Sequence, residues 1–241
     1  MKIDRVPSGL PGFDELVGGG LPRGAVVLLS GGPGSGKTLF SLQFLYNGAR
    51  QHGEPGVYLA LAESPEHVRR DASALGWDLS PLEAKGKFAL VDARPSRFVE
   101  GKGAEVEGVE TFSSWIWTLI SKNVERLKAH RLVIDSVNVV AGQFPEELQA
   151  RQTITGLVQQ LEKLPDCTSL LIFEQIKAER TMEEFLTHGV VILHYVPIKN
   201  GMMRAIQILK MRKTEHSENF HPFIIDSRGI RVEPKETSSF F

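Results

Sequence analysis

The stretch "GGPGSGKT", residues 31–38, decides the fold of this 241-residue chain. It fits the pattern G-x-x-x-x-G-K-[ST], which marks a loop that wraps a phosphate group. The preceding run "AVVLLS" (25–30) is apolar throughout, as in a buried strand, and the following run "LFSLQFLYN" (39–47) has helical spacing. Strand, glycine-rich loop and helix in this order predict a nucleotide-binding P-loop. The dinucleotide pattern G-x-G-x-x-G does not fit, because Lys37 or Leu39 would fall on its last glycine.

The chemistry of such a loop follows from its backbone and its last residues. Glycines allow close approach to the phosphate, and successive N–H groups at a helix N-terminus direct positive charge at it. Lys37 is predicted to reach the β- and γ-phosphate oxygens, and the Thr38 hydroxyl to ligate Mg²⁺. The motif therefore predicts a bound nucleotide together with Mg²⁺.

A second candidate for the same site is Asp135, which closes the apolar run "RLVIDS" (131–136). A carboxylate at such a strand end holds Mg²⁺, here through water, at the sheet edge where the phosphate loop lies. The alternative is an aspartate that only caps the next turn. Beside a complete phosphate loop, the magnesium role is favoured.

The remaining sequence alternates strand-like and helix-like stretches. Further apolar runs are followed by stretches with helical spacing, and Ser64 before Pro65 is predicted to begin one of these helices. This order predicts an α/β fold with a mostly parallel sheet and helices on both faces. The last strands form an antiparallel extension of that sheet. The expected strands are 25–30, 57–62, 87–92, 131–136, 169–174 and, in the extension, 190–196, 202–212, 221–226 and 229–234.

Two segments are predicted to lie outside the ordered core. Residues 94–110 are polar and glycine-rich, which indicates a mobile surface loop, and residues 234–241 are expected to be a disordered tail. The formal net charge of −1 does not favour a nucleic-acid or membrane-surface protein. The single cysteine, Cys167, excludes an internal disulfide, and no apolar run at the start indicates a signal peptide or a span. A cytoplasmic location is expected.

Several blocks, in order along nearly the whole chain, resemble the KaiC-like ATPases of the RecA superfamily. These blocks are "GFDELVGGGLPRG", "GSGKTLFSLQFLYNGAR", "EPGVYLALAES", "LGWDL", "LVIDSV", "EEFLTHGVVIL" and "ILKMRKTEHSENFHPFII". The clock protein of that family carries two such domains in tandem, whereas residues 1–241 are long enough for one, with 1–24 as an N-terminal segment. The resemblance implies a RecA-like P-loop core that binds ATP at the subunit interfaces of a homo-oligomer, usually a hexameric ring.

The resemblance also implies roles for individual positions. The residues matched to ATP binding are Gly32, Gly34, Ser35, Gly36, Lys37, Thr38 and Leu39, and those matched to the magnesium shell are Thr38 and Asp135. The residues matched to contacts with a neighbouring subunit's nucleotide are Lys210, Met211, Arg212, Thr214 and His216. Two cations at alternate strand positions lie on one face, which suits a γ-phosphate that gains negative charge in the transition state. Without the resemblance, an exposed edge strand with ordinary surface cations is the alternative.

The chain departs from the family at "YLALAES" (58–64), where the family usually has two successive glutamates. The first, the stronger candidate for general base, is replaced by Ala62, and only Glu63 remains. Successive strand residues point to opposite faces, so Glu63 is not expected to take over fully. A positioned base is worth roughly 10²–10⁴-fold in rate. We therefore expect slow ATP hydrolysis, with Glu63 as the remaining candidate catalytic group.

Three functions remain open. The first is a ring-forming ATP-binding protein with weak hydrolysis that serves as a regulatory or signalling switch. The second is a DNA-binding recombinase, whose DNA loops correspond here to 138–151 and 175–185. Each of these stretches carries one more carboxylate than cations, where phosphate binding needs a positive surplus, so nucleic acid is not an expected partner. The third is an autokinase, but this chain has no match to the paired Ser-Thr acceptor of the clock protein.

Overall fold

The computed structural model describes residues 3–99, 111–175, 182–199 and 201–237, and within these the chain builds one large twisted sheet. Its strand order is β11-β10-β9-β8-β3-β7-β6-β4-β5. The strands are β3 (Val26–Gly31), β4 (Gly56–Ala60), β5 (Phe88–Asp92), β6 (Arg131–Asp135), β7 (Thr168–Glu174), β8 (Gly189–Ile198), β9 (Gly201–Met211), β10 (Phe220–Asp226) and β11 (Gly229–Val232). Strand β3, which leads into the glycine-rich loop, lies centrally, between β7 and β8.

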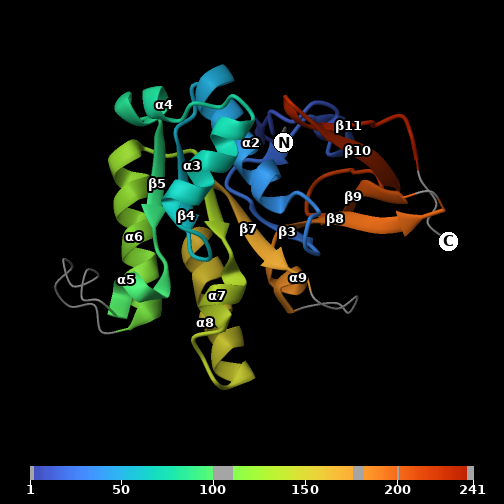
Figure 1. The fold of residues 1–241 in the computed structure, drawn as a ribbon. Helices are drawn as coiled ribbons and strands as arrows, with labels where there is room; N and C mark the ends of the chain where they lie inside the picture. The colour runs from blue at the N-terminus through green and yellow to red at the C-terminus, as the bar shows by residue number, and fades with distance from the viewer. Residues whose placement is uncertain (1–2, 100–110, 176–181, 200, 238–241) are drawn as a thin grey trace.

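Strand pairing divides the sheet into two parts. Strands β3 to β8 pair in parallel with their neighbours, whereas β9, β10 and β11 continue from β8 as antiparallel strands. Figure 1 shows this extension in orange and red, on the side of the molecule opposite to α6. The predicted α/β fold, with a mostly parallel sheet and a C-terminal antiparallel extension, is confirmed.

Helices cover both faces of the parallel part. They are α1 (Phe13–Leu16), α2 (Lys37–Gln51), α3 (Pro65–Ala74), α4 (Ser80–Ala84), α5 (Pro95–Val99), α6 (Phe112–Leu127), α7 (Val137–Ala141), α8 (Glu147–Leu161) and α9 (Met182–Leu186). Alternate residues of β3 face the two layers: Val27 and Leu29 pack in the core with α2 and α3, and Val26 and Leu28 in the core with α6, α7 and α8. Burial on both faces explains why "AVVLLS" is apolar throughout.

Some predicted boundaries and disordered segments need correction. Strand β4 ends at Ala60, two residues before the predicted end of 57–62. The predicted loop 94–110 begins with helix α5, and its residues 100–110 lie outside the described part. The predicted tail is placed over 234–237, where His221 Nδ1 donates to the Glu236 carbonyl over 2.8 Å, and 238–241 lie outside the described part. The expected Ser64 cap is confirmed, since its hydroxyl accepts from the His67 N–H.

The N-terminal segment is joined to the sheet through a fully buried arginine. Strand β1 (Arg5–Val6) pairs with β2 (Leu21–Pro22), and Arg131 from β6 reaches towards this hairpin. Arg131 donates to the Pro7 and Phe44 carbonyls, each over 2.8 Å, and to Glu54 over 2.6 Å. Gly48 leaves room for it, because a Cβ there would lie 2.3 Å from the Arg131 Nε. One side chain thus links the N-terminal segment, α2 and β6.

Replacing Arg131 with Leu is expected to lower the free energy of unfolding by about 3–5 kcal/mol, the usual cost of removing one partner of a buried pair. The Phe44 and Pro7 carbonyls would then lose the Arg131 donor, and Glu54 would keep its contact with Arg23 over 2.9 Å. The control is Arg151→Leu, because Arg151 also forms a 2.6 Å pair, with Glu147, but on the surface. That change is expected to cost about 1 kcal/mol or less. Urea denaturation measures both values, and equal small losses would contradict the structural role of Arg131.

Candidate functional site

The phosphate loop connects the end of β3 at Gly31 to the start of α2 at Lys37. Two of its glycines, Gly34 and Gly36, have φ values of 72° and 99°, a region that side-chain-bearing residues rarely adopt. A Cβ on Gly31 would lie 2.4 Å from the Leu193 carbonyl oxygen of β8. The strand, loop and helix predicted from "GGPGSGKT" are therefore present, and the glycines are required by the backbone path.

The loop brings the predicted phosphate and magnesium residues together. The Lys37 side chain is buried, and its Nζ donates to the Gly32 carbonyl over 2.9 Å. Thr38 Oγ1 donates to Asp135 Oδ2 over 3.2 Å, although the two residues are far apart in sequence. Burial lowers the pKa of the Lys37 ammonium, while Glu174 and Asp135 act in the opposite direction. The carboxylate at the end of β6 thus lies at the phosphate loop, as the sequence predicts.

The Thr38 and Asp135 oxygens suit a magnesium ion. Mg²⁺ prefers oxygen ligands, keeps several waters and often takes only one or two protein groups. A hydroxyl and a carboxylate already in hydrogen-bond contact beside the loop meet this requirement. Burial raises the pKa of the Asp135 carboxyl, while Tyr58, Thr38 and Lys37 oppose that effect.

Tyr58 is a site residue that the sequence reading missed. Its phenol, fully buried on β4, donates to Asp135 Oδ2 over 2.5 Å. The same aspartate also accepts, at its backbone carbonyl, the Leu61 and Ala62 N–H groups over 2.7 and 3.2 Å. Asp135 is therefore held at both its side chain and its backbone. Nothing in the apolar run "VYLALA" indicates that one side chain points at a carboxylate.

Two further carboxylates, Asp71 and Glu174, were also missed. Both line the cavity of about 420 Å³ beside the loop, together with Pro33, Gly34, Gly36, Lys37, Thr38, Leu39, Leu42, Ala74, Leu75 and Asp135. Glu174 ends β7 and is the register partner of Gly31 on β3. The signal was available, because "SLLIFE" ends in an acid as "RLVIDS" does. Asp71 comes from α3 and carries no comparable sequence signal.

The positions at the end of β4 differ from the expectation. Because β4 stops at Ala60, strand alternation does not decide where Ala62 and Glu63 point. Both residues are exposed. Partial burial and the nearby carboxylates of Asp71 and Asp135 raise the pKa of Glu63, but Glu63 is not among the residues that line the loop cavity. The expectation that Glu63 points to the face opposite position 62 assumed that the strand continues to residue 63, and this premise is wrong. The role of Glu63 stays a prediction.

The basic residues of "KMR" lie on one face, as predicted, but not at the phosphate loop of their own chain. Lys210 Nζ and Arg212 Nη2 both donate to the Phe185 carbonyl, over 3.4 and 3.3 Å. Thr214 accepts from Arg5 over 2.8 Å, and His216 contacts the carbonyl of the next residue. Met211, which ends β9, is buried. None of these predicted contact residues lines the loop cavity in the part of the chain that the structure describes.

A different basic residue reaches the loop from β9. Arg204 donates to the Gly34 carbonyl over 3.1 Å, and its guanidinium lies 4.3 Å from the Tyr195 ring centroid. The tyrosine in turn lies next to Gly34, where an added Cβ would be 3.4 Å from its ring. The antiparallel extension therefore contacts the phosphate loop directly, a contact that sequence reasoning did not foresee.

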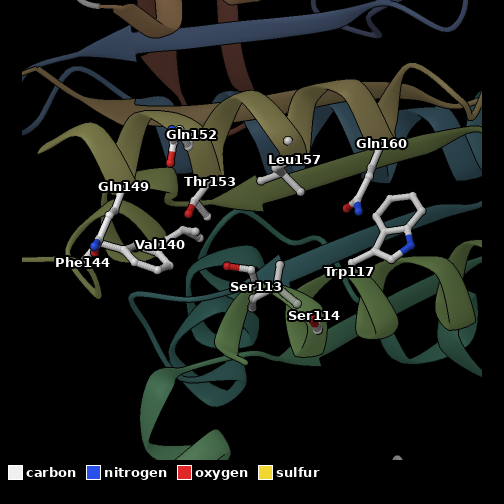
Figure 2. A pocket seen from close by; sticks show the side chains of 12 residues that line it. Ser113, Ser114, Trp117, Val140, Phe144, Gln149, Gln152, Thr153, Leu157 and Gln160 are labelled. Carbon is white, nitrogen blue, oxygen red and sulfur yellow. The ribbon is translucent and has the colours of Figure 1, made fainter. Parts of the chain in front are cut away.

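A second cavity, of about 500 Å³, lies between α6 and α8. Figure 2 shows Trp117 and Ser113 from α6 facing Gln160, Leu157 and Thr153 from α8. The described residues that line it include no charged side chain. This cavity is larger than the one at the loop, but it lacks the charge that a nucleotide phosphate requires.

Two other kinds of site are absent from the described residues. They contain no group of three or more His, Cys, Asp or Glu side chains arranged to hold a metal ion. No helix among them has the length and apolar character needed to cross a bilayer.

Three comparisons with known proteins agree with this site. A family model described as "ATPase: KaiC" matches residues 6–237. The UPF0273 protein of Thermotoga maritima is 37% identical over 97% of this chain and 98% of its own length. The circadian clock oscillator protein KaiC of Synechococcus elongatus is 36% identical over 96% of this chain, which spans 44% of that protein. A solved structure of a KaiC-like protein from Pyrococcus horikoshii superposes with a TM-score of 0.84 at 37% identity, covering 97% of this chain and 100% of that one.

Proposed function

The chain belongs to the KaiC ATPase family, and we propose that it binds Mg-ATP at the interfaces of a ring of identical copies, hydrolyses it slowly and serves as a cytoplasmic regulatory switch. One observation carries the proposal. The buried Lys37, the Thr38 hydroxyl and the Asp135 carboxylate meet at the loop between β3 and α2. A triphosphate is the ligand that uses all three groups together.

In this proposal each group has a separate task. The N–H groups of the loop and the first turn of α2 bind the phosphate oxygens, and the Lys37 ammonium leaves the Gly32 carbonyl to contact them. Thr38 and Asp135 would hold Mg²⁺, which when bound would supply positive charge at the phosphates. Tyr58 keeps Asp135 oriented towards Thr38.

Assembly into a ring is supported by where the "KMR" cations lie. Within one chain, Lys210 and Arg212 reach the Phe185 carbonyl instead of the loop cavity. Next to them the Phe185 side chain is 58% exposed. A cationic and apolar surface of this kind suits contact with the phosphate side of a second copy. The hexameric ring number comes from the family resemblance.

The test of this function is light scattering of the purified protein with and without Mg-ATP, combined with phosphate release. We expect assembly to depend on Mg-ATP, with phosphate release well below about 1 s⁻¹, the low end for ordinary enzymes. ADP without magnesium serves as the control. A protein that stays monomeric in saturating Mg-ATP, or that assembles equally without nucleotide, would contradict the proposed switch.

Lys210 and Arg212 are expected to act on the nucleotide of a neighbouring subunit. A Lys37→Ala chain keeps its own cations, and a Lys210→Ala/Arg212→Ala chain keeps its phosphate loop. In mixed rings some interfaces then combine an intact loop with intact cations, so turnover or assembly should exceed that of either mutant alone. The mixture is compared with each mutant at the same total concentration. No recovery in rings shown to contain both chains would count against the role across the interface.

The recombinase alternative finds no support in the described residues. The first stretch expected to face DNA, 138–151, is occupied by the end of α7 and the start of α8, and it keeps its excess of one carboxylate. Most of the second stretch, 175–185, lies outside the described part, and its sequence has the same excess. DNA binding needs a surplus of cations towards the phosphates. DNA retention with a steep salt dependence would reverse this ranking.

A further inference from the structure

Glu174 is a carboxylate at the phosphate site to which the function proposed above gives no task. It is the last residue of β7, and its register partner is Gly31, the last residue of β3 before the loop. The carboxyl ends of neighbouring parallel strands lie at the same sheet edge, where open α/β sheets bind their ligands. Glu174 therefore stands beside the first residue of the phosphate loop and lines the same cavity as Lys37 and Asp135.

The backbone of Glu174 is held at both of its polar groups by one side chain. The Glu174 N–H donates to Asn138 Oδ1 over 2.7 Å, and Asn138 Nδ2 donates to the Glu174 carbonyl over 3.2 Å. Asn138 belongs to α7, which follows directly after Asp135. The end of β7 is thus fixed to the segment that carries the magnesium carboxylate. A general base must be positioned in this way, because small displacements cost large factors in rate.

Glu174 lies close enough to the phosphate-binding lysine for its charge to favour the ammonium form of Lys37. Among the groups that raise the pKa of Lys37 against the effect of its burial, Glu174 is the stronger and Asp135 the weaker. Glu174 is exposed, so water can reach it. Asp135 is already occupied by Thr38 and Tyr58 at Oδ2. Of the two carboxylates near Lys37, Glu174 is the one without a magnesium task.

The other candidates fit less well. Glu63 is not among the residues that line the loop cavity, and the carboxylate that most affects its pKa is that of Asp71. Asp71 lines the cavity, but it comes from helix α3 and not from the end of a strand beside the phosphate loop. Glu174 alone combines a place at the strand end next to the loop with a backbone fixed to the Asp135 segment.

We propose that Glu174 is the general base of the slow hydrolysis, in place of the carboxylate that position 62 lacks; this inference rests on the function proposed above. Its carboxylate removes a proton from the attacking water, and the water oxygen forms a bond to the γ-phosphorus. The bond between that phosphorus and the β,γ-bridging oxygen breaks, and ADP leaves with the electron pair. The proton held by Glu174 then passes to solvent, leaving ADP and inorganic phosphate.

The experiment measures phosphate release with saturating Mg-ATP, together with ATP-induced thermal stabilisation, for wild type, Glu174→Gln and Glu174→Asp. Glu147→Gln, which removes an exposed carboxylate on α8, is the matched control. Glu174→Gln is expected to lower phosphate release at least tenfold, the low side of what a positioned base contributes. ATP-induced stabilisation and the apo melting temperature should not change. Glu174→Asp should retain an intermediate rate, and Glu147→Gln the wild-type rate.

Several results would overturn the inference. Wild-type phosphate release from Glu174→Gln would show that another group activates the water, and a loss confined to Glu63→Gln would identify that group. Loss of ATP-induced stabilisation in Glu174→Gln would indicate a binding role instead. If wild type released phosphate no faster than Lys37→Ala, the protein would not hydrolyse ATP, and Glu174 could not be its general base. Failure of wild type to bind ATP at all would instead refute the proposed function, so the two failures are distinct.

Discussion

Lys37→Ala is expected to abolish the thermal stabilisation that ATP gives, while the apo protein keeps its melting temperature. The Lys37 ammonium is buried beside the loop and is the group placed to contact the phosphates. Its removal should not unfold the loop, because the Gly32 carbonyl that it contacts also accepts from the Ser35 hydroxyl over 2.8 Å. A ligand at 100 times its dissociation constant stabilises by about 2.7 kcal/mol, and this increment is what should disappear.

Differential scanning fluorimetry with and without Mg-ATP measures the effect. The matched control is Lys87→Ala, since Lys87 also donates to a glycine carbonyl, that of Gly53, over 3.3 Å, but does not line the loop cavity. That variant should keep the full ATP response. Tight ATP binding by Lys37→Ala would remove the basis of the proposed site. If Lys37→Ala lowers the apo melting temperature, Lys37→Gln, which keeps a donor for the Gly32 carbonyl, separates folding from binding.

Local sequence signals were sufficient for the phosphate loop and for its magnesium carboxylate. The loop is specified within eight residues, and the glycines that it needs can be read directly, as at Gly34 and Gly36 with their positive φ values. Asp135 was found because an acid that ends an apolar strand is itself a local pattern. The contact with Thr38 then follows from the parallel sheet, in which strand ends meet at one edge.

The missed residues depend on the order of strands, which the sequence does not state. Tyr58 reaches Asp135 because β4 and β6 are neighbours, and Glu174 reaches the loop because β7 is next to β3. Arg204 contacts Gly34 because the antiparallel extension turns back towards the loop. Each of these contacts joins segments that lie far apart in the chain. Without the strand order, a tyrosine in an apolar run and an arginine on a late strand have no visible role.

The end of β4 was misjudged for a related reason. Leu61 and Ala62 continue the apolar run of the strand, so the sequence has no stop signal there. In the structure the Leu61 and Ala62 N–H groups both donate to the carbonyl of Asp135, although β4 itself ends at Ala60. The Asp135 carbonyl therefore fixes the segment that contains Ala62, where the family usually has its first glutamate. Position 62 is thus held next to the magnesium carboxylate, although strand alternation does not apply to it.

Restoring an acid at position 62 is expected to raise kcat at least tenfold, the low end of what a positioned base supplies. The Ala62 backbone is held to Asp135 over 3.2 Å, and the residue is exposed, so a glutamate side chain can be accommodated without displacing core groups. ATP affinity should stay nearly unchanged, because the new carboxylate acts on water. Phosphate release and ATP titration of Ala62→Glu and wild type measure the two quantities separately.

Three further variants determine what a gain in the rate of Ala62→Glu would mean. Ala74→Glu adds the same charge to the wall of the loop cavity, but on α3, and is expected to give no such gain. Ala62→Glu/Glu174→Gln should keep most of the raised rate, since the base at position 62 would then replace Glu174. Glu63→Gln should matter less than Ala62→Glu. A brisk wild-type rate that is lost in Glu63→Gln and unaffected by Ala62→Glu would instead identify Glu63 as the base, because position 62 would then have no part in activating water.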